Sequence, residues 1–202
     1  MSASQPEPVH GMIRSLRSVI LLRHGQYNDA APNQLGGLTA LGKKQAAATA
    51  ARLRDESIDR IVTSEYRRAR QTADEVARHH PSLTVETDLD ICECVPSVPP
   101  GQEVFYPEGV KASQTAECRE HLDRAYARYF ESDNEGTTLL VCHGNVIRYL
   151  LCRVLAVRLD AWARFDIHNC GICRVSSKTH LGTQVTGLND VGHLPLSLLT
   201  YG

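Results

Sequence analysis

The sequence contains no apolar stretch long enough to cross a membrane. A spanning helix needs roughly 18 or more apolar residues in a row, and no run in this chain of 202 residues approaches that length. Residues 1–17 also lack the apolar centre of a secretory signal, and Pro6, Glu7 and Pro8 argue against an amphipathic targeting helix. We therefore expect an intracellular, soluble protein with a flexible N-terminal arm over residues 1–17. The sequence does not distinguish the cytoplasm from mitochondria.

The chain also lacks an excess of charge of either sign. Its 22 lysines and arginines nearly balance its 23 aspartates and glutamates, which gives a formal net charge of -1. No global field attracts nucleic acid or an anionic membrane, so we expect neither partner, and any anion must be bound by a local site. The length and the hydrophobic content of 42% suit one well-filled core, which predicts a single domain over residues 18–202.

The chain also has an odd number of cysteines. Seven cysteines leave one unpaired in any disulfide scheme, and a chain without a secretory signal keeps its thiols reduced, so we expect no structural disulfide. The alternative is a zinc site made of Cys92, Cys94, Cys170 and Cys173. Its first pair has the wrong spacing and its second pair lies in an apparent strand. We predict buried, apolar cysteines, no metal site and no cofactor.

What the chain does contain is an apolar run that stops abruptly at polar residues. Residues 18–23 form a predicted buried strand, and Arg23, His24 and Gly25 stand at its carboxyl end. Ligands of open α/β sheets bind outside the carboxyl ends of the strands, so a cation, an imidazole and a glycine at this point suit an anion such as phosphate. On its own the tripeptide is a weak signal, because a histidine at a strand end is often only a scaffold.

A second apolar run repeats this arrangement. Residues 137–142 form another predicted strand, His143, Gly144 and Asn145 follow it, and helical spacing of apolar residues begins directly afterwards. His143 therefore lies at a strand-to-helix junction, where free backbone N–H groups can bind an anion. Two such junctions are much less probable by chance than one. We predict that His24 and His143 belong to one site.

The remaining pattern alternates between strands and helices. We predict helices over residues 40–55, 64–78 and 110–132, and strands over residues 58–63, 83–87, 171–177 and 183–188. Such alternation is typical of an α/β fold with βαβ units.

Two further segments place charged residues near the predicted crevice. Arg67, Arg68 and Arg70 open the second helix, where they oppose its dipole, and helical spacing cannot aim all of them inward. Solvent exposure is favoured for Arg67 and Arg70, which leaves one arginine to face a phosphate. Glu93 stands at the entrance of a proline-rich loop, and from the residue alone a solvated charge is the favoured interpretation.

In their order along the chain, these segments resemble the histidine phosphatase, or phosphoglycerate mutase-like, superfamily. The resemblance covers about residues 18–195, and within the family the chain is most similar to a mitochondrial protein serine/threonine phosphatase. It rests on Leu-Leu-Arg23-His24-Gly, on Ser64-x-x-x-Arg68-Ala-x-x-Thr72, on Glu93 before the proline-rich loop, and on Val-Cys-His143-Gly-Asn145.

The resemblance implies a three-layer αβα sandwich around a mostly parallel sheet. It assigns His24 as the nucleophile that becomes phosphorylated and Glu93 as the general acid. It makes Arg23, Arg68 and His143 the clamp on the phosphoryl group, and His143 also belongs to the catalytic set with His24 and Glu93. The implied activity is metal-independent hydrolysis of phosphomonoesters, with phosphoserine or phosphothreonine in proteins as substrates. Homo-oligomerisation is left open.

Three other interpretations remain at this point. A small-molecule phosphatase or a phosphoglycerate-type mutase would share the core, although a mutase carries longer insertions after the acidic residue. A catalytically silent interaction module would keep the fold alone. Substrate choice would depend on the loops over residues 26–37 and 94–109, whose shapes the sequence does not give.

Overall fold

The structure is a computed structural model, and it describes residues 15–99, 101, 110–132, 135–178 and 182–201. Residues 1–14 of the predicted N-terminal arm and most of the loop over residues 100–109 lie outside the described residues. The first strand begins at Ser15, ahead of its predicted start at residue 18.

A sheet of six strands forms the centre of the described part of the chain. In sequence order the strands are β1 (Ser15–Arg23), β2 (Arg60–Thr63), β3 (Val85–Thr87), β4 (Gly136–Cys142), β5 (Ile172–Lys178) and β6 (Gly182–Asp190). Their order across the sheet is β3-β2-β4-β1-β5-β6. The first four strands pair in parallel, and β5 runs antiparallel to both of its neighbours. The prediction of a mostly parallel sheet is confirmed.

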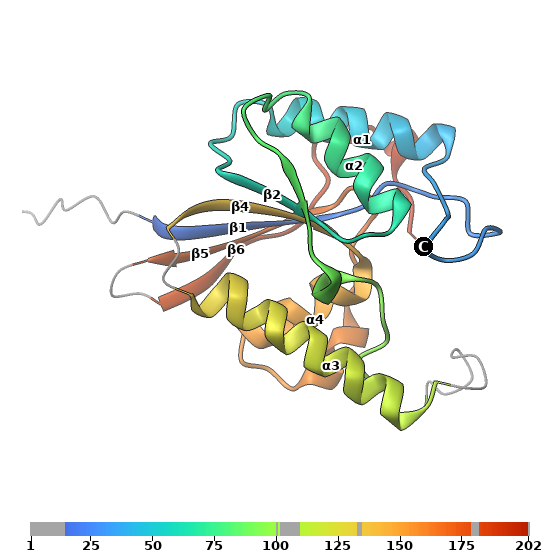
Figure 1. The fold of residues 1–202 in the computed structure, drawn as a ribbon, viewed down its shortest axis with the longest axis vertical. Helices are drawn as coiled ribbons and strands as arrows, with labels where there is room; N and C mark the ends of the chain where they lie inside the picture. Colours follow the sequence, from blue (N-terminus) through green and yellow to red (C-terminus); the bar gives the residue numbers. More distant parts are fainter. Residues whose placement is uncertain (1–14, 100, 102–109, 133–134, 179–181, 202) are drawn as a thin grey trace, which may run out of the picture.

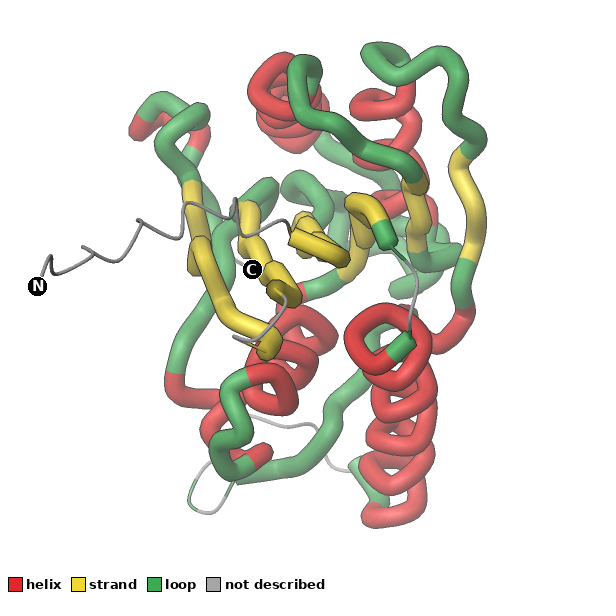
Figure 2. The backbone as a smooth tube through the Cα atoms, turned by 90° about the vertical axis from the view of Figure 1, so that its left-hand side faces the viewer, coloured by secondary structure: helices red, strands yellow, loops and turns green. Residues whose placement is uncertain are grey.

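Helices cover both faces of the sheet, so the three-layer αβα architecture is confirmed as well. On one face lie α1 (Ala40–Leu53) and α2 (Arg67–Ala77), and on the other α3 (Ala112–Tyr126) and α4 (Gly144–Val154) (Figure 1). Figure 2, turned by 90°, shows the same helices above and below the strands. None of the helices in the described part of the chain is both long enough and apolar enough to cross a membrane.

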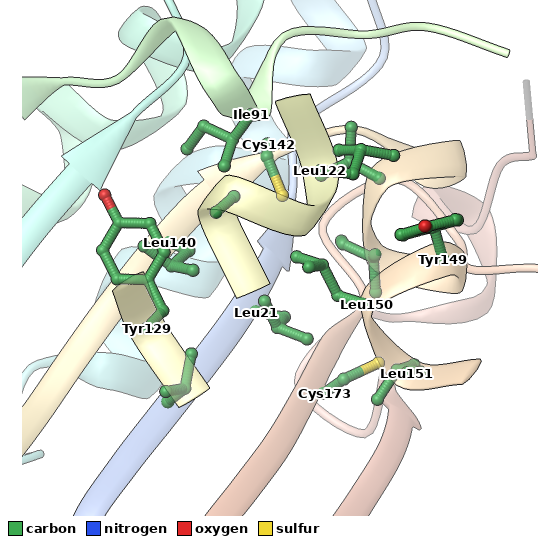
Figure 3. Packing of buried hydrophobic residues seen from close by; sticks show 14 of the residues in the cluster. Leu21, Ile91, Leu122, Tyr129, Leu140, Cys142, Tyr149, Leu150, Leu151 and Cys173 are labelled. Carbon is green, nitrogen blue, oxygen red and sulfur yellow. The ribbon is translucent and has the colours of Figure 1, made fainter. Parts of the chain in front are cut away.

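The strand pattern divides the core between these two faces. Side chains alternate along a strand, so Ile20 and Leu22 pack with the α1 and α2 side, whereas Leu21 packs with the α3 and α4 side. Figure 3 shows this second cluster, in which Leu21 lies among Leu122 of α3 and Leu150 of α4. Both faces of β1 are thereby buried, which agrees with its nearly continuous apolar sequence.

Most predicted boundaries are close to the observed ones, with a few instructive shifts. Thr39 caps α1 by accepting a hydrogen bond of 3.0 Å from the Gly42 backbone. Helix α2 begins at Arg67, and Ser64 is not its cap, because the Ser64 hydroxyl is bonded to His143. The predicted helix over residues 110–132 is α3 followed by a π-helical segment, η3 (Ala127–Glu131). The short helices are η1 (Leu89–Ile91), η4 (Leu159–Arg164) and η5 (Leu196–Leu198).

The cysteine prediction is wrong for one pair. Cys94, in the loop after η1, forms a disulfide with Cys118 of α3. The loop folds against this helix and brings the two Cα atoms to 5.8 Å, which is within the normal range for a disulfide. An odd count leaves one thiol unpaired but does not prevent other pairs from forming. Of the free cysteines, Cys142, Cys152, Cys170 and Cys173 are buried as predicted, and Cys92 is half-buried.

The topology places the two predicted histidine junctions side by side. Strands β1 and β4 are hydrogen-bonded neighbours in the sheet, and Arg23 is the register partner of Cys142. Because the pairing is parallel, the residues that follow each strand leave the sheet at the same edge. His24 and His143 therefore meet at that edge.

Candidate active site

The predicted site residues come together at the carboxyl edge of the sheet. Arg23 and His24 follow β1, Arg68 lies on the first turn of α2, and Glu93 lies in the loop after η1. These four line a cavity of about 420 Å³, together with Tyr27, Asp29, Ala31, Asn33 and Asn145. The fifth residue, His143, is fully buried and packs its ring 5.0 Å from the ring of His24.

The hydrogen bonds of His24 fix its tautomer. Its Nδ1 lies 2.8 Å from the Gly25 carbonyl oxygen. Since a carbonyl only accepts, Nδ1 carries the proton and Nε2 carries the lone pair. Arg68 Nε donates to this Nε2 at 3.0 Å. Burial, with help from the charges of Arg23 and Arg68, lowers the pKa of His24 well below its usual value. His24 is thus a neutral imidazole whose lone pair lies between two guanidinium groups.

The backbone around His24 is held from several sides. Asn169 donates through Nδ2 to the His24 carbonyl at 3.2 Å, and the Gly25 N–H donates to Thr72 Oγ1 at 3.1 Å. A Cβ atom on Gly25 would lie 2.6 Å from the Gly42 carbonyl oxygen, so only glycine allows this approach to α1. The sequence reasoning missed Asn169, for which no local pattern gave a signal.

Arg68 is the inward-facing member of the arginine group. Its side chain is buried, whereas Arg67 and Arg70 are exposed. Its guanidinium carbon lies 4.2 Å from the ring centre of Tyr27 and 5.0 Å from that of Tyr66, so the cation is held between two aromatic rings. Its Nη1 donates to the Asn33 carbonyl. The roles of Tyr27 and Tyr66 were not predicted, because cation–π contacts have no sequence spacing.

Arg23 supplies the second buried cation. Its Nη1 donates to the Ile167 carbonyl and lies 3.9 Å from Asp166 Oδ1. Burial lowers the pKa of this guanidinium, but arginine remains charged in proteins. The guanidinium also lies 3.5 Å from the position of a Cβ on Gly144, an ordinary contact distance that places Arg23 beside the start of α4. Two cations and a helix N-terminus thus converge on His24, which favours an anionic ligand.

His143 lies beneath the cavity and is bonded on one side only. Its Nε2 is 2.7 Å from the Ser64 hydroxyl, and its Nδ1 is 3.9 Å from Glu93 Oε2. Among the described residues this buried Nδ1 has no hydrogen-bond partner. Burial and the nearby His24 and arginines lower the pKa of His143 well below its usual value. When the Ser64 hydroxyl donates to Nε2, the proton of the neutral ring is on Nδ1, which is then available to donate a hydrogen bond. Ser64 was recognised only as part of a motif.

Glu93 is not the solvated charge that its loop position favoured. Only 22% of its side chain is exposed, and Oε1 is buried without a hydrogen-bond partner among the described residues. Burial raises the pKa of Glu93 to about 7, although the charges of Arg23, Arg68 and Arg148 act in the opposite direction. The group therefore exchanges its proton near neutral pH, which a general acid and base requires.

The assembled groups suit the cleavage of a phosphomonoester. Two guanidinium groups can bind phosphoryl oxygens in a bidentate manner, a neutral imidazole can attack phosphorus, and a carboxyl group can donate a proton. Within the described ranges, no group of three or more histidine, cysteine, aspartate or glutamate side chains is arranged to hold a metal ion.

Comparisons with known proteins agree with this chemistry. Residues 19–98 and 99–191 match the model of the histidine phosphatase superfamily (branch 1). The chain is 34% identical over 199 residues to the mitochondrial serine/threonine-protein phosphatase Pgam5 of Drosophila grimshawi, covering 93% of this chain and 68% of that protein. It is 33% identical over 201 residues to the human protein of the same name, covering 95% and 68%.

Solved structures share the fold. One is a putative alpha-ribazole-5'-P phosphatase from Escherichia coli, with a TM-score of 0.73, 18% identity, and coverage of 87% of this chain and 97% of that one. Another is a mycobacterial glucosyl-3-phosphoglycerate phosphatase, with a TM-score of 0.64, 24% identity, and coverage of 86% and 98%.

Proposed function

Because this chain belongs to the histidine phosphatase superfamily and is a phosphatase, we propose that it hydrolyses phosphoserine and phosphothreonine in proteins through a phosphohistidine at His24. The observation that carries this proposal is the state of His24. It is a neutral imidazole that lines the cavity together with two buried arginines, and its Nε2 accepts a hydrogen bond from one of them, Arg68.

Binding of the phosphoryl group is the first step. Arg23 and Arg68 bind its oxygens, and Nδ1 of His143 donates to a further oxygen. Arg68 Nε donates to His24 in the structure, so its transfer to the phosphoryl group uncovers the Nε2 lone pair when substrate binds. The charge of the guanidinium groups offsets the charge of the phosphate, which otherwise repels a nucleophile.

Transfer to His24 follows. Nε2 forms a bond to phosphorus while the bond from phosphorus to the ester oxygen breaks, and the Gly25 carbonyl accepts a hydrogen bond from Nδ1–H as the ring becomes cationic. A serine or threonine alkoxide is a poor leaving group, so its oxygen needs a proton. Glu93, whose pKa is about 7, donates it.

Hydrolysis of the phosphohistidine completes the cycle. The ionised Glu93 takes a proton from water, the water oxygen bonds to phosphorus, and the bond to Nε2 breaks. Glu93 is protonated again and His24 is neutral, so both groups return to their starting states. Arg23 and Arg68 balance the charge of the phosphate until it leaves the site.

The substrate class rests on the curated relatives. Their names describe serine/threonine-protein phosphatases of mitochondria, and the similarity extends over almost the whole chain. We extend both the protein substrate and the mitochondrial location to this chain as part of the proposal. Asp29, Ala31 and Asn33, which line the cavity, belong to the loop over residues 26–37, and we propose that this loop contacts the peptide around the phosphorylated residue.

A trapping experiment with His24→Ala tests the proposed intermediate. Wild type incubated briefly with a labelled phosphoserine peptide should retain label that is labile to acid and stable to base, and His24→Ala should retain none. His79→Ala, which removes an exposed histidine, is the matched control and should behave as wild type. Label that persists in His24→Ala contradicts the assignment. A panel in which phosphoglycerate or sugar phosphates give higher kcat/KM than every phosphopeptide contradicts the substrate class.

A further inference from the structure

The Cys94–Cys118 disulfide lies directly beside the proposed proton donor. Cys94 is the residue that follows Glu93, in a loop without regular structure. Cys118 is only 3% exposed and belongs to the buried cluster that anchors α3, with Leu122 and Ala125. The disulfide therefore joins the loop that carries Glu93 to the buried face of α3.

Hydrogen bonds also connect this loop to the rest of the described chain. Asn145 donates through Nδ2 to the Cys94 carbonyl at 3.0 Å, and Arg119 donates to the Pro96 carbonyl at 2.7 Å. A hydrogen bond from the Asn145 backbone also reaches Glu93. These bonds restrain the loop from the α4 side and from beyond Cys94, whereas the disulfide is its covalent link to α3.

The disulfide borders open space. A second cavity, of about 450 Å³, is lined by Cys94 and Cys118 and also by Glu93, which it shares with the phosphate cavity. A small thiol that enters this cavity therefore comes next to both cysteines and to Glu93. The free thiol of Cys92 lines this cavity too, but burial raises its pKa to about 11, so little thiolate is present at neutral pH to attack the neighbouring disulfide.

We propose that the Cys94–Cys118 disulfide is a positioning element for Glu93, and that its reduction slows proton transfer while the phosphate clamp stays intact. The inference rests on the proposed role of Glu93. The clamp does not depend on this bond, because Arg23, His24, Arg68 and His143 are held by β1, α2 and β4.

Reduction requires a dithiol. One thiolate of the reductant attacks either sulfur, and the other cysteine leaves as a thiolate and takes up a proton. The second thiol of the reductant then attacks the mixed disulfide, so the reductant leaves as its cyclic disulfide and both cysteines are thiols. Two electrons and two protons move from the reductant to the protein.

Opening the bond affects Glu93 in two ways. A freed loop admits water to the carboxyl group, so its pKa falls toward the ordinary value and less of the acid form is present at neutral pH. Displacement by about 1 Å also misaligns the proton with the leaving oxygen, which by itself can cost up to about 100-fold in rate. Activated aryl phosphates need little protonation, so their transfer to His24 should change little.

The test compares oxidised wild type, dithiol-reduced wild type and Cys118→Ala. Turnover of a phosphoserine peptide should fall roughly 10- to 100-fold on reduction, whereas the phosphoenzyme burst from nitrophenyl phosphate should stay within about threefold. The high-pH limb of peptide turnover should move to lower pH. Cys118→Ala should resemble the reduced wild type and should not respond to reductant, and Cys92→Ser should respond as wild type does. Reoxidation should restore turnover.

Each contrary result has a definite meaning. Equal peptide turnover before and after reduction overturns the inference, and so do equal losses with both substrates or seven titratable thiols in protein purified without reductant. If Cys118→Ala does not fold, the reduced wild type decides, provided its near-UV circular dichroism is unchanged. An oxidised enzyme without any phosphohistidine contradicts the proposed function instead, because that result does not involve the disulfide.

Discussion

At the scale of single residues, Arg68 has two tasks that follow each other in time. It caps the Nε2 lone pair of His24 in the structure, and in the proposed cycle it then moves to the phosphoryl group. The rings of Tyr27 and Tyr66 both contact the guanidinium and restrict where it can move.

Arg68→Ala should therefore lose much more activity than Arg67→Ala, whose side chain is exposed. A hydrogen bond to a charged group contributes about 1.5 to 3 kcal/mol, and 1.36 kcal/mol is tenfold in rate, so kcat/KM should fall roughly 10- to more than 100-fold. Removing the nearby cation should also raise the pKa of His24 and move the low-pH limb of kcat/KM upward. Steady-state kinetics over pH measures both effects, and equal losses in the two variants would contradict the clamp assignment.

Glu93 sets the expected pH dependence at high pH. Its pKa is raised to about 7, so the acid form predominates below this pH and is lost as the pH rises through it. Turnover limited by protonation of an alkyl leaving group should therefore decline above pH 7. Glu93→Gln should lose the roughly 10²- to 10⁴-fold typical of acid–base catalysis with phosphoserine and should show no such limb.

Nitrophenyl phosphate provides the control for this variant, because its phenolate leaves without a proton. The burst should survive Glu93→Gln better than phosphoserine turnover does, although breakdown of the phosphoenzyme should slow. Burst and steady-state rates must be measured separately. Identical losses with both substrates would assign the acid to another group.

The positions of some candidate site residues could be predicted from the ends of single strands. Arg23, His24 and His143 each follow an apolar run, and parallel pairing brings such ends together. The burial of Glu93 could not be inferred from its neighbours in sequence, because the groups that enclose it come from β1, α2 and α4. The contact between Ser64 and His143 likewise forms only when β2 and β4 pair.

At the scale of elements, the start of α1 lies unusually close to the loop that follows β1. A Cβ atom on Gly42 would lie 1.9 Å from the Gln26 carbonyl oxygen, and no side-chain movement relieves a clash with backbone. Gln26 also accepts through its carbonyl from the Thr39 backbone, so the same contact sets the helix cap. The loop that carries His24 is thus fitted to α1.

Gly42→Ala should consequently lower the free energy of unfolding by about 1 to 3 kcal/mol, the usual range for overpacking, and should lower activity as the loop shifts. Gly187→Ala in β6 is a suitable control, since its Cβ would meet only ordinary contacts at 3.6 Å or more. Urea unfolding and phosphatase assays of both variants make the comparison. An unchanged stability in Gly42→Ala would show that the backbone adapts.

Most helices and strands could be predicted from the sequence, but the direction in which neighbouring strands pair could not. The apolar patterns over residues 171–177 and 183–188 indicated two strands, and these form the β5–β6 hairpin. Periodicity does not say which neighbour a strand pairs with, so the antiparallel position of β5 beside β1 required the structure. Helix α2 begins at Arg67, later than predicted. The Ser64 hydroxyl is bonded to His143 and does not cap the helix.

At the scale of the whole molecule, the disulfide should contribute to stability as well as to positioning. It closes a loop with a sequence separation of 24, for which the chain-entropy model gives about 3.5 kcal/mol. The free energy of unfolding should therefore be lower by about that amount in Cys94→Ala/Cys118→Ala than in oxidised wild type. Denaturant unfolding with and without a dithiol measures the difference, and a loss below about 1 kcal/mol would show that the loop is already restrained in the unfolded chain.

This disulfide also marks the limit of reasoning from composition. The parity of the cysteine count describes the composition of the chain and does not give the distance between Cys94 and Cys118. That distance depends on where the loop after η1 crosses α3, a tertiary contact with no local signature.

The pairing of β1 with β4 determines when the site can form during synthesis and folding. These strands belong to opposite halves of the chain, and their pairing alone brings the two histidines together. Contacts between such distant segments give a high contact order and slow, late assembly. The nascent first half therefore carries His24, the proposed nucleophile, without His143, and the proposed site is complete only when β4 has been synthesised and has paired with β1.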